Sequence, residues 1–134
     1  MASGQPFGIA AGDLNADGKP DVVVANATTG QLSVATNTTA APGTITYGTR
    51  LDFMVSATAS PRAVSIVDVD NDGKPDMVST NADINSFSVF RNTTAASAAI
   101  SFASIVSFAT GSTPVAMAAA DFDGDGKIDI AITC

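Results

Sequence analysis

The sequence predicts an all-β protein made of β-propeller blades, each with four antiparallel strands. An Asp-rich loop occurs three times in the 134 residues, and successive copies are 55 and then 53 residues apart. Short runs of small and β-branched apolar residues, which favour strands, flank every copy. Four short strands at a fixed period of this length are typical of a propeller blade rather than a solenoid coil. We therefore expect two full blades and the inner half of a third.

The three loops share one arrangement of side chains. Each carries a carboxylate or amide oxygen at loop positions 1, 3, 5 and 9, and a glycine at position 6, where the backbone must bend sharply. Oxygens gathered in this way suit a hard cation, most of all calcium. The pattern predicts about three calcium ions per chain. The first, second and third loops are residues 13–21, 68–76 and 121–129.

Two other interpretations of these loops explain less. A polar hairpin turn also uses Asp and Gly, but it requires only one or two of the shared residues. An EF-hand requires a bidentate Glu at position 12 of its loop. Here that position holds Val24, Ser79 and Ile132, and strand-forming residues rather than an amphipathic helix follow each loop.

The composition excludes several classes of protein. Glu, His and Trp are absent, and 11 of the 13 Asp residues lie in the loops, so the net charge of −7 is concentrated there. An acidic chain lacks the basic face that nucleic-acid binding requires. No apolar stretch is long enough to span a bilayer, and the N-terminus lacks a signal sequence. Cys134 is the only cysteine, which leaves an intermolecular disulfide open.

Each repeat starts at a proline seven residues before its loop: Pro6, Pro61 and Pro114. One apolar run lies between the proline and the loop, and a second run follows the loop. Neither run alternates cleanly with polar residues, so we expect both strands to be covered on both faces. The expected first strands are 7–11, 63–67 and 115–119, and the expected second strands are 22–25, 77–80 and 130–133.

A third and a fourth strand complete the first two repeats. The third alternates apolar and polar residues at 32–34 and 87–89, and the fourth follows a Thr/Ala-rich turn. No stretch fits a helix, and the Ala-rich residues 93–99 are expected to form a loop. Blade 1 then covers about 6–60, blade 2 about 61–113 and a partial blade 3 about 114–134. The matching fourth-strand residues are Ile45 with Ile100, Tyr47 with Phe102, and Phe53 with Phe108.

The units resemble FG-GAP/VCBS repeats, the calcium-binding blades of integrin-α-like β-propellers. The resemblance rests on the Asp-rich loops, the prolines ahead of them and the Asn-Thr-Thr turns at Asn37 and Asn92, and it covers nearly the whole chain. It implies a seven-bladed ring in which calcium lies between the first and second strands of a blade, held by four side chains and the position-7 carbonyl. The implied ligands are Asp13, Asn15, Asp17, Lys19 and Asp21; Asp68, Asp70, Asp72, Lys74 and Asp76; and Asp121, Asp123, Asp125, Lys127 and Asp129.

The sequence departs from a complete ring. It stops after the second strand of the third blade, whereas a closed propeller needs at least about four blades. Three interpretations are open: the sequence belongs to a longer parent chain, several copies form a homo-oligomer that completes the ring, or the blades form an open array. Because residues 121–133 nearly duplicate residues 13–25, the terminal half-blade would compete for the place of the first half-blade of a neighbouring chain. We expect a homo-oligomer.

These observations predict a calcium-stabilised, non-catalytic scaffold for binding or adhesion to proteins or glycans, in a secreted or cell-surface parent protein. Catalysis is disfavoured because His, Glu and a Gly-x-Ser-x-Gly elbow are absent. The alternatives are a lectin-like carbohydrate-binding propeller or an accessory domain of a larger extracellular enzyme. Sugar pockets usually present aromatic platforms, but Tyr47 is expected to be a core residue. Asn-x-Thr sequons begin at Asn26, Asn37 and Asn92, where chance matches are expected in a Thr-rich chain.

Overall fold

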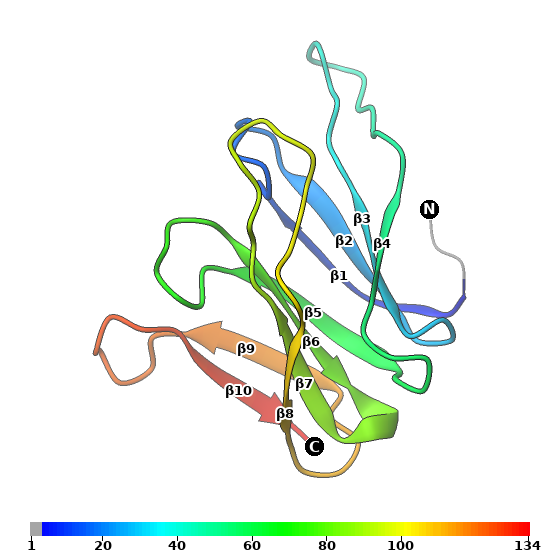
Figure 1. Cartoon of the computed structure of the whole chain (residues 1–134), viewed down its shortest axis with the longest axis vertical. Coiled ribbons are helices and arrows are strands. Elements are labelled where there is room, and N and C mark those ends of the chain that lie inside the picture. The colour runs from blue at the N-terminus through cyan, green and yellow to red at the C-terminus, as the bar shows by residue number, and fades with distance from the viewer. Residues whose placement is uncertain (1–3) are drawn as a thin grey trace.

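The computed structural model describes residues 4–134, which form antiparallel β-sheets and one short 3-10 turn (Figure 1). The elements are β1 (Pro6–Gly12), β2 (Asp21–Asn26), β3 (Gln31–Ala35), β4 (Leu51–Met54), β5 (Pro61–Val67), β6 (Asp76–Asn81), η1 (Ala82–Ile84), β7 (Ser86–Phe90), β8 (Val106–Ala109), β9 (Ala116–Ala120) and β10 (Asp129–Thr133). The first sheet has the order β1-β2-β3-β4 and the second β5-β6-β7-β8. β9 and β10 pair as the third sheet.

The first two sheets repeat the same register. A register irregularity follows the proline that opens β1 and the proline that opens β5. The predicted all-β class with antiparallel four-stranded repeats is confirmed, and residues 93–99 form a loop as expected. Ring closure and the number of blades stay predictions. Beyond β3 and β7 the chain adds isolated bridges that pair Asn37 with Tyr47 and Asn92 with Phe102.

The core lies between the first and second sheets. We call the face of a sheet that points toward the next sheet along the chain its front, and the opposite face its back. Leu32 and Val34 on the front of the first sheet are fully buried. Phe53 meets Phe102 edge-on, with ring centroids 4.9 Å apart, and Phe90 lies 6.2 Å from Phe102. Full burial of one large apolar side chain contributes about 1.5–3 kcal/mol to the free energy of unfolding. The packing of the front of the first sheet on the back of the second is therefore a major part of the stability.

The first strands of the three sheets in residues 4–134, β1, β5 and β9, lie next to one another (Figure 1). Glycines let β1 approach β5 closely. A Cβ atom on Gly8 would lie 2.5 Å from the Arg62 carbonyl oxygen and 2.9 Å from the Val64 nitrogen. A Cβ atom on Gly12 would lie 2.7 Å from Cγ2 of Ile66. The backbone of β1 therefore packs against β5 where a side chain would separate them.

Burial of the inner strands differs in part from expectation. β2 and β6 are buried along nearly their whole length, as predicted for strands covered on both faces. The same prediction was wrong for β1, β9 and β10, which have no fully buried residue, and Ile9 is 71% exposed. Tyr47 is 39% exposed rather than a core residue, although Phe102 does pack in the core. Within residues 4–134, no sheet covers the back of the first sheet or the front of the third.

Gly8→Ala is expected to lower the free energy of unfolding by about 1–3 kcal/mol, because the new methyl group would force β1 away from β5. The matched control is Gly48→Ala, whose Cβ would meet its nearest atom, Cγ2 of Thr38, at an ordinary 3.4 Å. The control is expected to change stability by less than about 0.5 kcal/mol. Urea unfolding of both variants measures the difference, and equal losses would contradict the close approach of β1 and β5.

Candidate metal centre

The Asp-rich loops connect the first and second strand of each sheet at the same end of the molecule (Figure 1). Their glycines at position 6 have φ angles of 83°, 84° and 84°, in the left-handed region that glycine adopts without strain. These glycines are Gly18, Gly73 and Gly126. The local sequence therefore folds all three loops in the same way.

The carboxylate at position 1 organises the turn of each loop. In the second loop, Asp68 accepts the N–H of Asp72 at 3.2 Å and that of Gly73 at 2.8 Å. Asp13 and Asp121 accept the same two N–H groups in their own loops, at 2.7–3.1 Å. One carboxylate thus replaces the backbone carbonyls that would satisfy these donors in a regular turn.

The carboxylate at position 9 holds the loop to the rest of its sheet. Asp76 is 1% exposed and accepts the N–H of Val69 at 3.0 Å and the N–H of Asn92, just after β7, at 2.7 Å. Asp21 is fully buried and accepts the equivalent pair, Leu14 at 3.0 Å and Asn37 at 2.8 Å.

Burial raises the pKa of both position-9 carboxyl groups, Asp21 and Asp76, and the accepted N–H groups lower it in part. The neighbouring loop carboxylates raise the pKa further, since they repel the charged form. A cation beside these groups would relieve both unfavourable effects.

Carboxylate oxygens from positions 1, 3 and 9 converge in two of the loops. Oxygens of Asp68, Asp70 and Asp76 lie within 4.8 Å of one another, as do those of the third loop. Two oxygens that each lie about 2.3–2.6 Å from one calcium ion are at most about 5 Å apart. The spacing within each group therefore fits one ion per loop. The equivalent group in the first loop has an amide at position 3, since Asn15 replaces the carboxylate. The third-loop group is Asp121, Asp123 and Asp129.

The carboxylates at position 5 lie outside these two groups. Each accepts the N–H of the lysine at position 7, at 3.0, 2.9 and 2.8 Å. The predicted role of position 5 and of the position-7 carbonyl as ligands therefore stays a prediction. The residues concerned are Asp17 and Lys19, Asp72 and Lys74, and Asp125 and Lys127.

Residues 13–79 and again 68–132 match the FG-GAP-like repeat family. The chain belongs to this family. The two matches overlap at the second loop, so one FG-GAP-like unit runs from a loop through its sheet to the following loop and strand. Searches of curated proteins and of solved structures gave no match. In the described part of the chain, no helix has the length and apolar character needed to cross a membrane.

Hydrogen bonds from the FG-GAP-like repeat of the second sheet reach the loop of the first. Asn92 uses its side-chain Nδ2 to donate to the carbonyl of Pro75 at 2.8 Å and to that of Leu14 at 2.9 Å. Ser97 donates its N–H to the carbonyl of Asn15 at 2.6 Å. The Asn-Thr-Thr turn was evident in the sequence, but the bond from Asn92 to the preceding loop was not predicted. The repeated Asn after the third strand was the sequence feature that could have suggested this bond.

The same burial bears on the Asn-x-Thr sequons of the FG-GAP-like repeats. Asn26 is fully buried and Asn92 is 3% exposed, and both side-chain amide groups donate hydrogen bonds inside the fold. A glycan cannot occupy an amide nitrogen that is enclosed in this way. The folded chain therefore excludes glycosylation at these two positions.

Asp76→Ala is expected to destabilise the protein even without calcium, because two buried N–H groups lose their acceptor. The expected loss is about 2–4 kcal/mol in urea unfolding with excess chelator. The matched control is Asp129→Ala, because Asp129 accepts the N–H of Phe122 at 3.1 Å in the more exposed third loop. A loss below about 1 kcal/mol is expected for the control. Equal effects at the two positions would contradict a special structural role for the buried carboxylate.

Proposed function

We propose that this chain is a calcium-stabilised, non-catalytic β-propeller module that serves as a scaffold for binding or adhesion. The observation that supports it best is the convergence of acidic oxygens in loops that repeat within an FG-GAP-like family. FG-GAP repeats are generally non-catalytic binding modules, and they often bind calcium. The protein would present its outer strands and hairpins to a protein or glycan, in a secreted or cell-surface setting.

Calcium would act through the preorganised loops. Without a cation, the carboxylates at positions 1, 3 and 9 repel one another while the backbone N–H groups hold them together. A bound divalent ion supplies the positive charge that offsets this repulsion and fixes the two strands that flank the loop. Asp68, Asp70 and Asp76 would hold it in the second loop, and Asp121, Asp123 and Asp129 in the third. Asp13, Asn15 and Asp21 would form a less charged site in the first.

The non-catalytic part of the proposal follows from the chemistry of the side chains. The sequence has no His, and its one thiol, Cys134, is exposed at the end of the chain. The Asp residues that would be candidates for acid-base work already accept backbone N–H groups in the loops. These contacts favour a structural metal over a reactive one.

Assembly of several chains is the second part of the proposal. The structure presents two four-stranded sheets and a two-stranded third sheet within residues 4–134. Apolar residues on the back of the first sheet, such as Ile9 and Ile45, and on the front of the second, such as Val106 and Phe108, are exposed. We propose that copies of the chain associate so that sheets of neighbouring chains stack as the first two sheets do within one chain.

A lectin-like role is the alternative. A groove of about 430 Å³ lies between the first loop and the hairpin of residues 36–50, and it is lined by polar groups of Lys19, Asn37 and Thr39 beside Pro42 and Ile45. Hydroxyl and amide groups can bond to the hydroxyl groups of a sugar, and the apolar side chains can pack against its ring. Binding of the calcium-loaded protein to a glycan array would favour this alternative.

Removal of calcium is expected to lower the melting temperature by about 5–10 °C, since a site filled at 100 times its Kd contributes about 2.7 kcal/mol. Thermal unfolding followed by circular dichroism, with excess calcium and then with excess chelator, measures the shift. Asp121→Ala is expected to lower the number of bound ions by one in calorimetry. Asp83→Ala, which lies outside the loops, is the control. An unchanged melt in chelator would refute the structural role of calcium.

Arg91→Thr is expected to raise the calcium affinity of the second loop about three- to tenfold, because it removes a positive charge beside the site. The Arg91 guanidinium lies 2.5 Å from Asp70 Oδ2, and the equivalent residue of the first repeat is Thr36. The control is Arg50→Thr, which breaks the 2.8 Å ion pair with Asp52 outside the loops. Calcium titration calorimetry of the two variants makes the comparison, and an unchanged affinity for Arg91→Thr would exclude competition by the guanidinium.

A further inference from the structure

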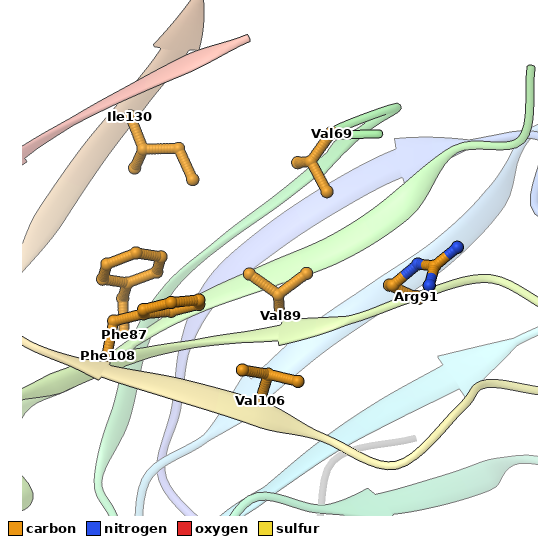
Figure 2. A pocket seen from close by; sticks show the side chains of 7 residues that line it. All are labelled: Val69, Phe87, Val89, Arg91, Val106, Phe108 and Ile130. Carbon is orange, nitrogen blue, oxygen red and sulfur yellow. The ribbon is translucent and has the colours of Figure 1, made fainter. Parts of the chain in front are cut away.

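An apolar groove crosses the front of the second sheet. It has a volume of about 330 Å³ and is lined by apolar side chains from β7, β8 and β10, together with Val69 and Arg91 (Figure 2). The rings of Phe87 and Phe108 stack within it, with centroids 4.9 Å apart. Val106 is 47% exposed and Phe108 is 48% exposed. Ile130 of the third sheet lines one side, and no strand among residues 4–134 covers the β8 side.

The repeat itself shows what covers a face of this kind. Phe87, Val89, Val106 and Phe108 are 55 residues after Leu32, Val34, Leu51 and Phe53, which form the front of the first sheet. There, Leu32 and Val34 are fully buried, and Leu51 and Phe53 pack against the same core. The cover in that case is the back of the following four-stranded sheet.

Six apolar side chains on the back of the second sheet make this contact, and three of them, Ile66, Met77 and Phe90, have the smaller equivalents Ala11, Val22 and Ala35 on the first sheet. The other three have large apolar equivalents. Val64 and Phe102 pack against the core, and Ile100 is 6% exposed within it. Their equivalents on the back of the first sheet, 55 residues earlier, are Ile9, Tyr47 and Ile45. Ile9 and Ile45 are both 71% exposed, and Tyr47 is 39% exposed.

Of the two polar contacts that reach the first loop, that of Asn92 has an equivalent, whereas the residue equivalent to Ser97 is Pro42, which has no N–H to donate. In the chain, the Asn92 amide donates to the carbonyl of Leu14 in the preceding loop. The equivalent donor on the first sheet is Asn37, whose Nδ2 already donates to its own Pro20 carbonyl at 3.1 Å, as Asn92 does to Pro75. The equivalent acceptor on the second sheet is the carbonyl of Val69, at the edge of the groove.

We propose that the front of the second sheet binds the back of the first sheet of a second copy of this chain. Tyr47 and Ile45 of one copy enter the groove between Val106 and Phe108 of the other, and Ile9 packs beside β5 as Val64 packs beside β1. This inference rests on the assembly part of the proposed function and names its two surfaces. The supporting observation is that the first two sheets of one chain already stack through the equivalent surfaces.

The incoming sheet takes the place that β9 and β10 occupy. Residues 121–133 and 13–25 share the loop pattern, with five identical residues in 13, and both continue into a short apolar strand, so the incoming β1 and β2 offer β5 a similar partner. The two-stranded third sheet contributes Ile130 to the groove but leaves Val106 and Phe108 about half exposed. A four-stranded sheet also brings its third and fourth strands and hairpin, which cover that remaining half. Exchange therefore buries more apolar surface than the third sheet does.

The contact joins different surfaces of the two copies and is therefore heterologous. Each copy presents one groove and one back face, so binding at one surface leaves the other available. This property allows a test that separates the proposed contact from symmetric or non-specific association.

The test uses light scattering after size-exclusion chromatography, in excess calcium and in chelator. Tyr47→Asp removes the entering side chain and keeps the groove, whereas Phe108→Asp spoils the groove and keeps the back face. The wild-type chain is expected to assemble, each variant alone to be a monomer, and an equal mixture of the two to form a discrete heterodimer that does not grow. Ile45→Asp and Val106→Asp form a second pair with the same expectation.

Val115→Asp is the control, because Val115 is 50% exposed but lies outside both surfaces and outside the Asp-rich loops; it is expected to assemble as the wild type does. Wild-type assembly that the four variants leave unchanged would overturn these surfaces while leaving an oligomeric module in place. Monomeric variants that fail to combine would overturn the pairing of the two surfaces. A monomeric wild-type chain would overturn both this inference and the assembly part of the proposed function. Assembly that persists in chelator supports the inference, and the calcium proposal is tested by the melting experiment alone.

Discussion

Two buried carboxylates, those of Asp21 and Asp76, hold together parts of the chain that are distant in sequence. Each accepts one N–H from the start of its loop and another from the second residue after the third strand. The four-stranded sheet, the Asp-rich loop and the outer hairpin are thereby fixed to one charged group. Burying a charged carboxylate without a counter-charge is unfavourable. The group that organises the sheet would therefore be stabilised by a cation beside it.

Stacking of front on back then joins one repeat to the next. Large apolar side chains fill the interface, while Asn92 and Ser97 carry hydrogen bonds from the second sheet to the first loop. The Asp-rich loop of the first repeat is thus in contact with the hairpin of the second repeat. Order in the loop and order in the interface are consequently linked.

The sequence predicted what depends on local chemistry. The Asp and Gly spacing predicted the loops, and the match of Phe53 with Phe108 placed the fourth strands. Tyr47 and Phe102 were expected in the fourth strands, but they precede β4 and β8 and form only isolated bridges. The exposure of Ile9 and Tyr47 could not be predicted from local sequence patterns, because it depends on whether another sheet packs on the back of the first sheet. The ion pair of Arg91 with Asp70 joins residues 21 positions apart in different elements, and no local pattern signals it.

The three loops lie along one rim of the molecule, and they carry 11 of the 13 Asp residues of a chain with a net charge of −7. This uneven distribution makes the electrostatic potential strongly negative at the rim and weak at the opposite end, where the strands turn back. Cations that diffuse near the protein are attracted to the rim by this potential. Salt at physiological ionic strength screens the attraction beyond a Debye length of about 8 Å, so the attraction weakens as the ionic strength rises.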